Sequence, residues 1–83
     1  MNLNRTNLAR RIREVRLALY GEEGVWALAK SLGLPPKTWL NYEQGVTMPA
    51  DVLLGFLEIT ETVPHWLLTG EGDLIKPREA ATR

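Results

Sequence analysis

Residues 28–45 read LAKSLGLPPKTWLNYEQG and divide into two helical segments joined by a turn. Apolar residues in the first part recur at the three- and four-residue spacing of one buried helical face, and Gly33 follows as a helix stop. Each of the two prolines keeps the residue before it out of the helical region, although Pro36 can open a new helix. The stretch therefore predicts a helix over 25–32, a tight turn and a helix over 36–44.

The same periodicity predicts three further helices, over about 7–20, 49–60 and 64–69. The first carries a narrow apolar stripe of Leu8, Ile12, Val15 and Leu19. Helix 49–60 is apolar over a wider arc than one buried face requires, so either other helices surround it or it forms a contact between two copies. No strand pattern is present. We predict an all-α fold, with a compact five-helix domain over 1–70 and a mobile tail over 71–83.

Length and composition suit one small domain and exclude several kinds of chemistry. The 83 residues include one histidine and no cysteine, so the usual ligands of zinc and the usual reactive thiol are lacking. No apolar run is long enough to cross a bilayer. We therefore expect a cytoplasmic protein that is not an enzyme, with no membrane contact, metal, cofactor or small-molecule ligand.

The ten basic and ten acidic residues balance, but they are unevenly distributed. Residues 1–20 hold five arginines against Glu14, a net charge of +4. Residues 21–45 hold two lysines and three glutamates, a net charge of −1, and residues 46–83 hold three basic and six acidic residues, a net charge of −3. A protein without net charge can thus present one basic face to a polyanion.

Helix 36–44 has two different sides on a helical wheel. The side expected to be buried carries Thr38, Trp39, Tyr42 and Glu43, and the other carries Pro36, Lys37, Leu40, Asn41 and Gln44. A helix-turn-helix presents its second helix to the major groove of DNA. There Asn41 can pair with adenine, Lys37 with guanine or a phosphate, and Leu40 can contact a thymine methyl. The predicted base-reading residues are Pro36, Lys37, Leu40 and Asn41.

Contacts with DNA phosphates are predicted from the elements around this helix. The N-terminus of helix 25–32 offers main-chain N–H groups and the positive end of a helix dipole. Gln44 lies nearer the DNA backbone and positions the helix rather than reading bases. The predicted phosphate-contacting residues are Arg11, Arg16, Val25, Trp26 and Gln44. Arg10 and Arg13 are predicted to face solvent.

Other side chains have simpler interpretations. Trp39 and Trp66 are predicted to lie in the core, whereas the position of Trp26 stays open between the core edge and the surface. His65 has no second ligand near it in the sequence, so it is predicted to be a surface residue at a helix start.

At these residues the chain resembles the lambda-repressor-like family, the helix-turn-helix domains of phage repressors and Cro. The matching pieces are Ile12 with Arg16, Leu28-Ala29-x-x-Leu32-Gly33, Tyr42-Glu43-x-Gly45 followed by Pro49, and Trp66-Leu67-Leu68-Thr69-Gly70-Glu71-Gly72. The resemblance implies a five-helix domain that regulates transcription, commonly as a homodimer on double-stranded DNA, and hence a nucleoid-associated protein. It also implies an ion pair between Glu43 and Arg16. The residues predicted to hold the motif together are Arg16, Gly33, Trp39, Tyr42, Glu43 and Gly45.

The sequence departs from the family pattern where DNA contacts are expected. The loop between the first two helices is about two residues longer than the compact family form. Val25 stands where a glutamine is frequent, Pro35 replaces a serine or threonine cap, and Pro36 replaces a polar residue that reads bases. Two functions are therefore predicted: a sequence-specific DNA-binding regulator of phage or bacterial repressor type, or a protein-interaction module on the same fold, such as an antirepressor, an antitoxin-like factor or a co-regulator.

Overall fold

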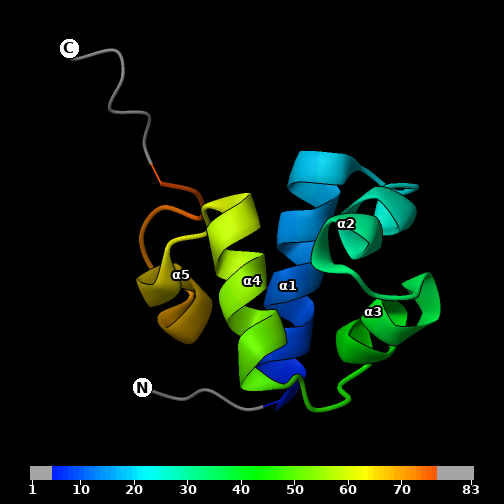
Figure 1. Cartoon of the computed structure of the whole chain (residues 1–83). Coiled ribbons are helices and arrows are strands. Elements are labelled where there is room, and N and C mark those ends of the chain that lie inside the picture. The colour runs from blue at the N-terminus through cyan, green and yellow to red at the C-terminus, as the bar shows by residue number, and fades with distance from the viewer. Residues whose placement is uncertain (1–4, 77–83) are drawn as a thin grey trace, which may run out of the picture.

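A computed structural model describes residues 5–76 of the chain, and these residues form five helices and no strand (Figure 1). The helices are α1 (Arg5–Tyr20), α2 (Val25–Leu32), α3 (Pro36–Glu43), α4 (Ala50–Thr60) and α5 (Pro64–Thr69). The predicted all-α class and the order of the five helices are confirmed. Within the described range, no helix is long and apolar enough to cross a membrane.

The core lies where α1, α2, α3, α4 and α5 meet around Trp39 and Phe56, both of which are fully buried. The Trp39 ring stacks on Phe56 with centroids 5.3 Å apart and meets Tyr42 edge-on at 6.1 Å. The remaining core residues are Ile12, Val15, Val25, Leu28, Ala29, Trp66 and Leu67. Large aromatic rings dominate the burial energy of a small domain. The predicted core positions of Trp39 and Trp66 are confirmed.

The turns on either side of α2 depend on glycine. A Cβ atom at Gly24 would lie 2.1 Å from the Cβ of Tyr20, so the loop after α1 can close this tightly only without a side chain. Gly33 adopts φ 73° and its N–H bonds the carbonyls of Ala29 and Lys30, which ends α2 as the sequence predicts.

The predicted apolar stripe of α1 is wrong at Leu19, and the question left open for α4 is answered in part. Leu19 is 46% exposed, because Tyr20 rather than Leu19 packs on the core where α1 ends. On α4, Val52, Leu53 and Leu57 pack on the core, whereas Leu54 is 64% exposed and Ile59 is 41% exposed. The other helices therefore do not surround α4 completely, and the predicted contact between two copies stays a prediction.

The prediction of a mobile tail is wrong for residues 74–76, which are bonded to the segment that follows α4. Ile75 pairs with Thr62 in an isolated antiparallel bridge, and the main-chain N–H groups of Val63 and Lys76 donate to the carbonyls of Leu74 and Glu61, each at 2.9 Å. Leu74 and Ile75 also pack against the core. One bridge between distant segments leaves no periodic pattern in the sequence, so the prediction missed it. The prediction for 77–83 falls outside the described residues.

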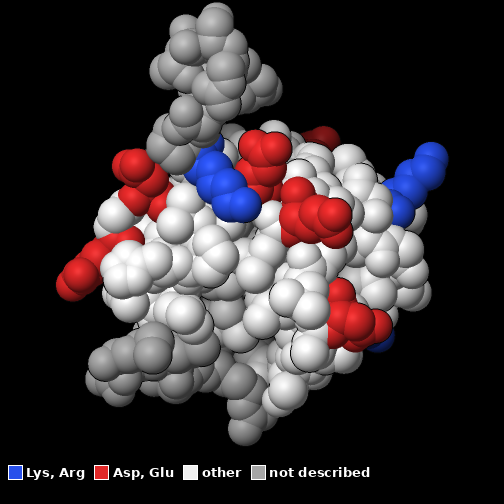
Figure 2. Space-filling model, turned by 60° about the vertical axis from the view of Figure 1, so that its left-hand side comes forward, with Lys and Arg blue, Asp and Glu red and all other residues white. Residues whose placement is uncertain are grey.

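The acidic part of the chain gathers on the side of α4 and α5. Asp51, Glu58, Glu61, Glu71 and Asp73 are all exposed there, and Figure 2 shows the acidic groups spread over this face. The described part of this region has one basic residue, Lys76. The side of α4 and α5 is therefore acidic and repels polyanions.

Candidate nucleic-acid interface

The local sequence fixes where α3 begins and ends. Pro35 is extended at ψ 146°, and its carbonyl accepts the N–H groups of Thr38 and Trp39. Pro36 then opens the helix, where its missing N–H costs nothing. The predicted loss of a side-chain cap at Pro35 is confirmed. At the other end, Gln44 is the C-cap and Gly45 takes φ 105°. The turn from α2 to α3 is thus short and stiff.

The buried side of α3 is held by a polar cluster around Glu43. Its carboxylate accepts bonds from Arg16 Nε at 3.0 Å and Arg16 Nη2 at 2.9 Å, and from Trp39 Nε1 at 2.5 Å. The side chains of Arg16 and Glu43 are only 5% and 2% exposed. The ion pair implied by the resemblance is confirmed. The bond from Trp39 was not predicted, although Trp39 and Glu43 are four residues apart on the helix and therefore adjacent on its surface.

Arg16 also joins α3 to the loop before α2. Its Nη1 donates to the carbonyls of Gly21 at 3.0 Å and Glu22 at 2.9 Å. The hydrogen bonds to Glu43 raise the pKa of the Arg16 guanidinium above its ordinary value, against the opposing effect of burial. The guanidinium is therefore permanently charged, and its planar fork is occupied by acceptors within the protein.

The phosphate contacts predicted for Arg16 and Arg11 stay predictions, and both guanidinium groups already bond acceptors within the protein. Arg16 is buried with the partners described above. Arg11 Nη1 donates to the carbonyl of Leu67 at 3.0 Å, which ties α1 to α5. The Leu67 carbonyl lies 56 residues from Arg11 along the chain, so a helical wheel of α1 alone cannot show that contact.

The other predicted contact residues fall into three groups. Lys37, Leu40, Asn41 and Gln44 are exposed together along one side of α3, and Pro36 is half-buried at its start. The side chain of Val25 is buried, so only its main-chain N–H could meet a phosphate. Trp26 is 73% exposed, which answers the question left open by the sequence.

Three grooves border this exposed side. The first, which we call the basic groove, encloses about 410 Å³ between α1 and the end of α3. Its lining residues are Thr6, Ala9, Arg10, Arg13, Glu43, Gln44 and Gly45. The second lies between the α1–α2 loop and the start of α3, encloses about 620 Å³, and is bordered by the exposed carboxylates of Glu22 and Glu23 together with Lys37. The surface of α3 is therefore flanked by opposite charges at its two ends.

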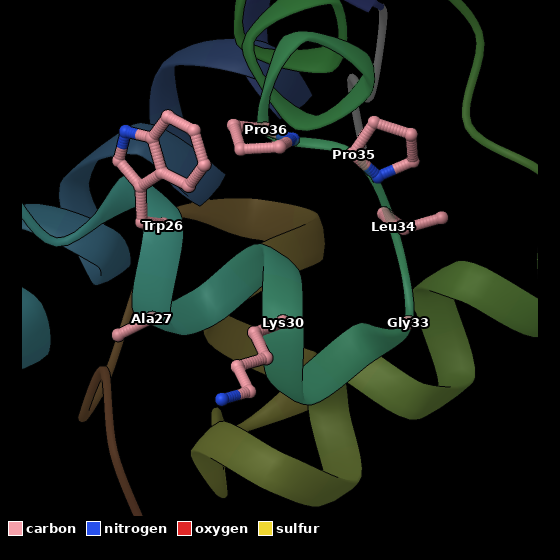
Figure 3. Close-up of a pocket in the computed structure, with 7 residues that line it drawn as sticks. All are labelled: Trp26, Ala27, Lys30, Gly33, Leu34, Pro35 and Pro36. Carbon is pink, nitrogen blue, oxygen red and sulfur yellow. The ribbon is translucent and has the colours of Figure 1, made fainter.

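The third, which we call the apolar groove, encloses about 660 Å³ between α2 and the turn that follows it. Its lining residues are Trp26, Ala27, Lys30, Gly33, Leu34, Pro35 and Pro36. Figure 3 shows the rings of Trp26 and Pro36 near each other, with the Lys30 amine pointing away from both. The groove thus offers apolar surface and little hydrogen bonding, which suits contact with another protein better than contact with phosphate.

No family model, curated protein or solved structure matches this chain. Within residues 5–76, no group of three or more histidine, aspartate or glutamate side chains could hold a metal ion.

Proposed function

We propose that this chain is a lambda-repressor-like helix-turn-helix protein that binds double-stranded DNA and regulates transcription at the nucleoid. The observation that carries the proposal is the exposed side of α3, where Lys37, Leu40, Asn41 and Gln44 lie together. These side chains supply a cation, an apolar contact and two amides on one helix, which are the groups that read base edges and position a helix on DNA.

The buried cluster supports the same proposal, because a reading helix needs a rigid base. Glu43 anchors α3 to Arg16 on α1, and Trp39 packs on Phe56 of α4. A helix whose buried side is held by such contacts loses little conformational freedom when its exposed side binds a partner. Placed in the major groove, Asn41 would pair with adenine, Lys37 would donate to guanine or a phosphate, and Gln44 would orient the end of the helix. A homodimer on a two-fold site is part of this proposal.

Selection of bound sequences from random duplex DNA tests the proposal most directly, because it reports binding, base preference and half-site spacing together. We expect enrichment of a short motif, and a mobility shift that weakens in Lys37→Ala and Asn41→Ala. Lys76→Ala is the matched control, because Lys76 is exposed far along the chain from α3. Saturating protein that gives neither enrichment nor a shift at low salt would overturn the proposal.

A second candidate is a protein-interaction module, and the apolar groove favours it. Among residues 5–76, Trp26 is the most exposed of the large apolar side chains, and it lines this groove. The experiment that separates the two functions is a footprint on DNA alongside recovery of a stable protein complex. A complex that Trp26→Ser abolishes, with no DNA footprint by wild type, would favour the interaction module. A clear DNA footprint, with no protein partner recovered, would contradict the interaction module.

A further inference from the structure

Only some arginines of α1 have guanidinium groups available to a ligand. Arg11 is bonded to the carbonyl of Leu67 and Arg16 to the carboxylate of Glu43, so a phosphate would compete with these acceptors for both guanidinium groups. Arg10 and Arg13 are three residues apart on the outer face of α1, and both are exposed. Together they line the basic groove beside Gln44, next to the end of α3.

The charge of the basic groove is positive. The one carboxylate that lines it belongs to Glu43, which is 2% exposed and neutralised by Arg16. Glu14 follows Arg13 on the exposed surface of α1, but in the described part of the chain no ion pair joins a carboxylate to Arg10 or Arg13. The other end of α3 differs, because the exposed carboxylates of Glu22 and Glu23 stand there beside Lys37.

The helix dipole explains why two cations are useful at this place. The C-terminal end of α3 carries the partial negative charge of the dipole, which repels a phosphate. Cations beside that end cancel the repulsion, and a guanidinium adds two parallel N–H donors that fit phosphate oxygens. The basic groove thus supplies, next to Gln44, the positive charge that α3 itself lacks there.

We infer that the backbone of one DNA strand runs along the basic groove, and that Arg10 and Arg13 donate to its phosphates. This inference rests on the proposed DNA binding and adds the strand contact that the sequence assigned to Arg11 and Arg16. The two ends of α3 would then contact DNA differently. Arg10 and Arg13 of α1 bind the DNA backbone near Gln44, whereas the carboxylates of Glu22 and Glu23 weaken DNA contact near Lys37.

The salt dependence of DNA binding tests the inference. For wild type and Arg10→Ala/Arg13→Ala, the dissociation constant is measured from low to moderate salt on the selected motif and on a scrambled duplex. The slope of log K against log salt should fall by roughly 0.9 for each lost phosphate contact. Affinity should fall by the same factor on both duplexes, because phosphate contacts carry no base preference. Circular dichroism should show an unchanged melting temperature, since both side chains are exposed.

Two control variants make the test decisive. Lys30→Ala/Lys76→Ala removes the same charge from exposed positions away from the basic groove and should leave the slope close to that of wild type. Glu22→Gln/Glu23→Gln should strengthen binding at low salt. If wild type binds DNA and the double arginine variant keeps its slope, the inference is wrong and the proposed function stands. If wild type binds no duplex, the proposed function is wrong, and the inference that rests on it is wrong as well.

Discussion

On the buried side of α3, Glu43 accepts three hydrogen bonds from Arg16 and Trp39, whereas on the exposed side Lys37 and Asn41 extend into solvent. Both sides carry polar groups, and both belong to one eight-residue helix. On the first side, the Glu43 carboxylate and the Trp39 indole N–H are fixed by partners within the protein. On the second, the polar groups are left for a partner outside it. Substitutions on the two sides should therefore separate stability from binding.

The largest effect is expected for Glu43→Ala. This change leaves the buried Arg16 guanidinium without its carboxylate, and breaking a buried pair from one side costs about 3–5 kcal/mol. Thermal unfolding followed by circular dichroism measures the loss. Asn41→Ala, on the exposed side of the same helix, is the control and should change stability by no more than ~0.5 kcal/mol. Equal melting temperatures for Glu43→Ala and wild type would show that the buried side of α3 contributes no more to stability than the exposed side.

The next effect concerns binding alone. Asn41→Ala should weaken binding to the selected motif by about 1–3 kcal/mol, the value of one good bidentate base contact. The loss should be concentrated at one A·T pair, which competition with singly substituted duplexes would show. A uniform loss on every duplex would instead assign Asn41 to the phosphate backbone.

A smaller effect is expected where Leu40 meets the DNA. Leu40 is 40% exposed on the reading side of α3. If it contacts a thymine methyl, replacing that thymine with deoxyuridine should weaken wild-type binding about fourfold, from ~0.8 kcal/mol per buried methyl. Leu40→Ala should bind both duplexes equally. A variant that still discriminates thymine from deoxyuridine would place the methyl contact on another residue.

The smallest effect is a gain in stability away from both sides of α3. A Cβ at Gly55 would lie 3.5 Å from Leu32 Cδ2, an ordinary contact, so Gly55→Ala fits within α4. Removing a glycine from a helix interior should stabilise the protein by up to ~1 kcal/mol. The melting temperature should rise and DNA affinity should stay unchanged. Gly24→Ala is the contrast, because its Cβ would clash with Tyr20 and should lower the melting temperature.

Local signals in the sequence predicted the helices well. The spacing of Leu28, Ala29 and Leu32, the stop at Gly33 and the start at Pro36 each depend on a few neighbouring residues, so a helical wheel and backbone preferences suffice. The same wheel separated Trp39 and Tyr42 from Lys37 and Asn41, and the structure buries the first pair and exposes the second. The predictions are wrong at Leu19, where a helix ends, and at Ile75, where a segment distant in the sequence pairs with Thr62.

The sequence by itself determined the five helices and the two sides of α3, because helical periodicity is a property of adjacent residues. Only the tertiary structure decided which arginines of α1 can meet a ligand. Arg11 bonds the carbonyl of Leu67, which is 56 residues away along the chain. Arg16 pairs with Glu43, 27 residues away, a contact that the family resemblance implied but no local pattern shows. A long cationic side chain reaches any acceptor that folding brings near it, and no local pattern records which acceptor that is. Folding thus leaves Arg10 and Arg13 as the exposed cations beside α3.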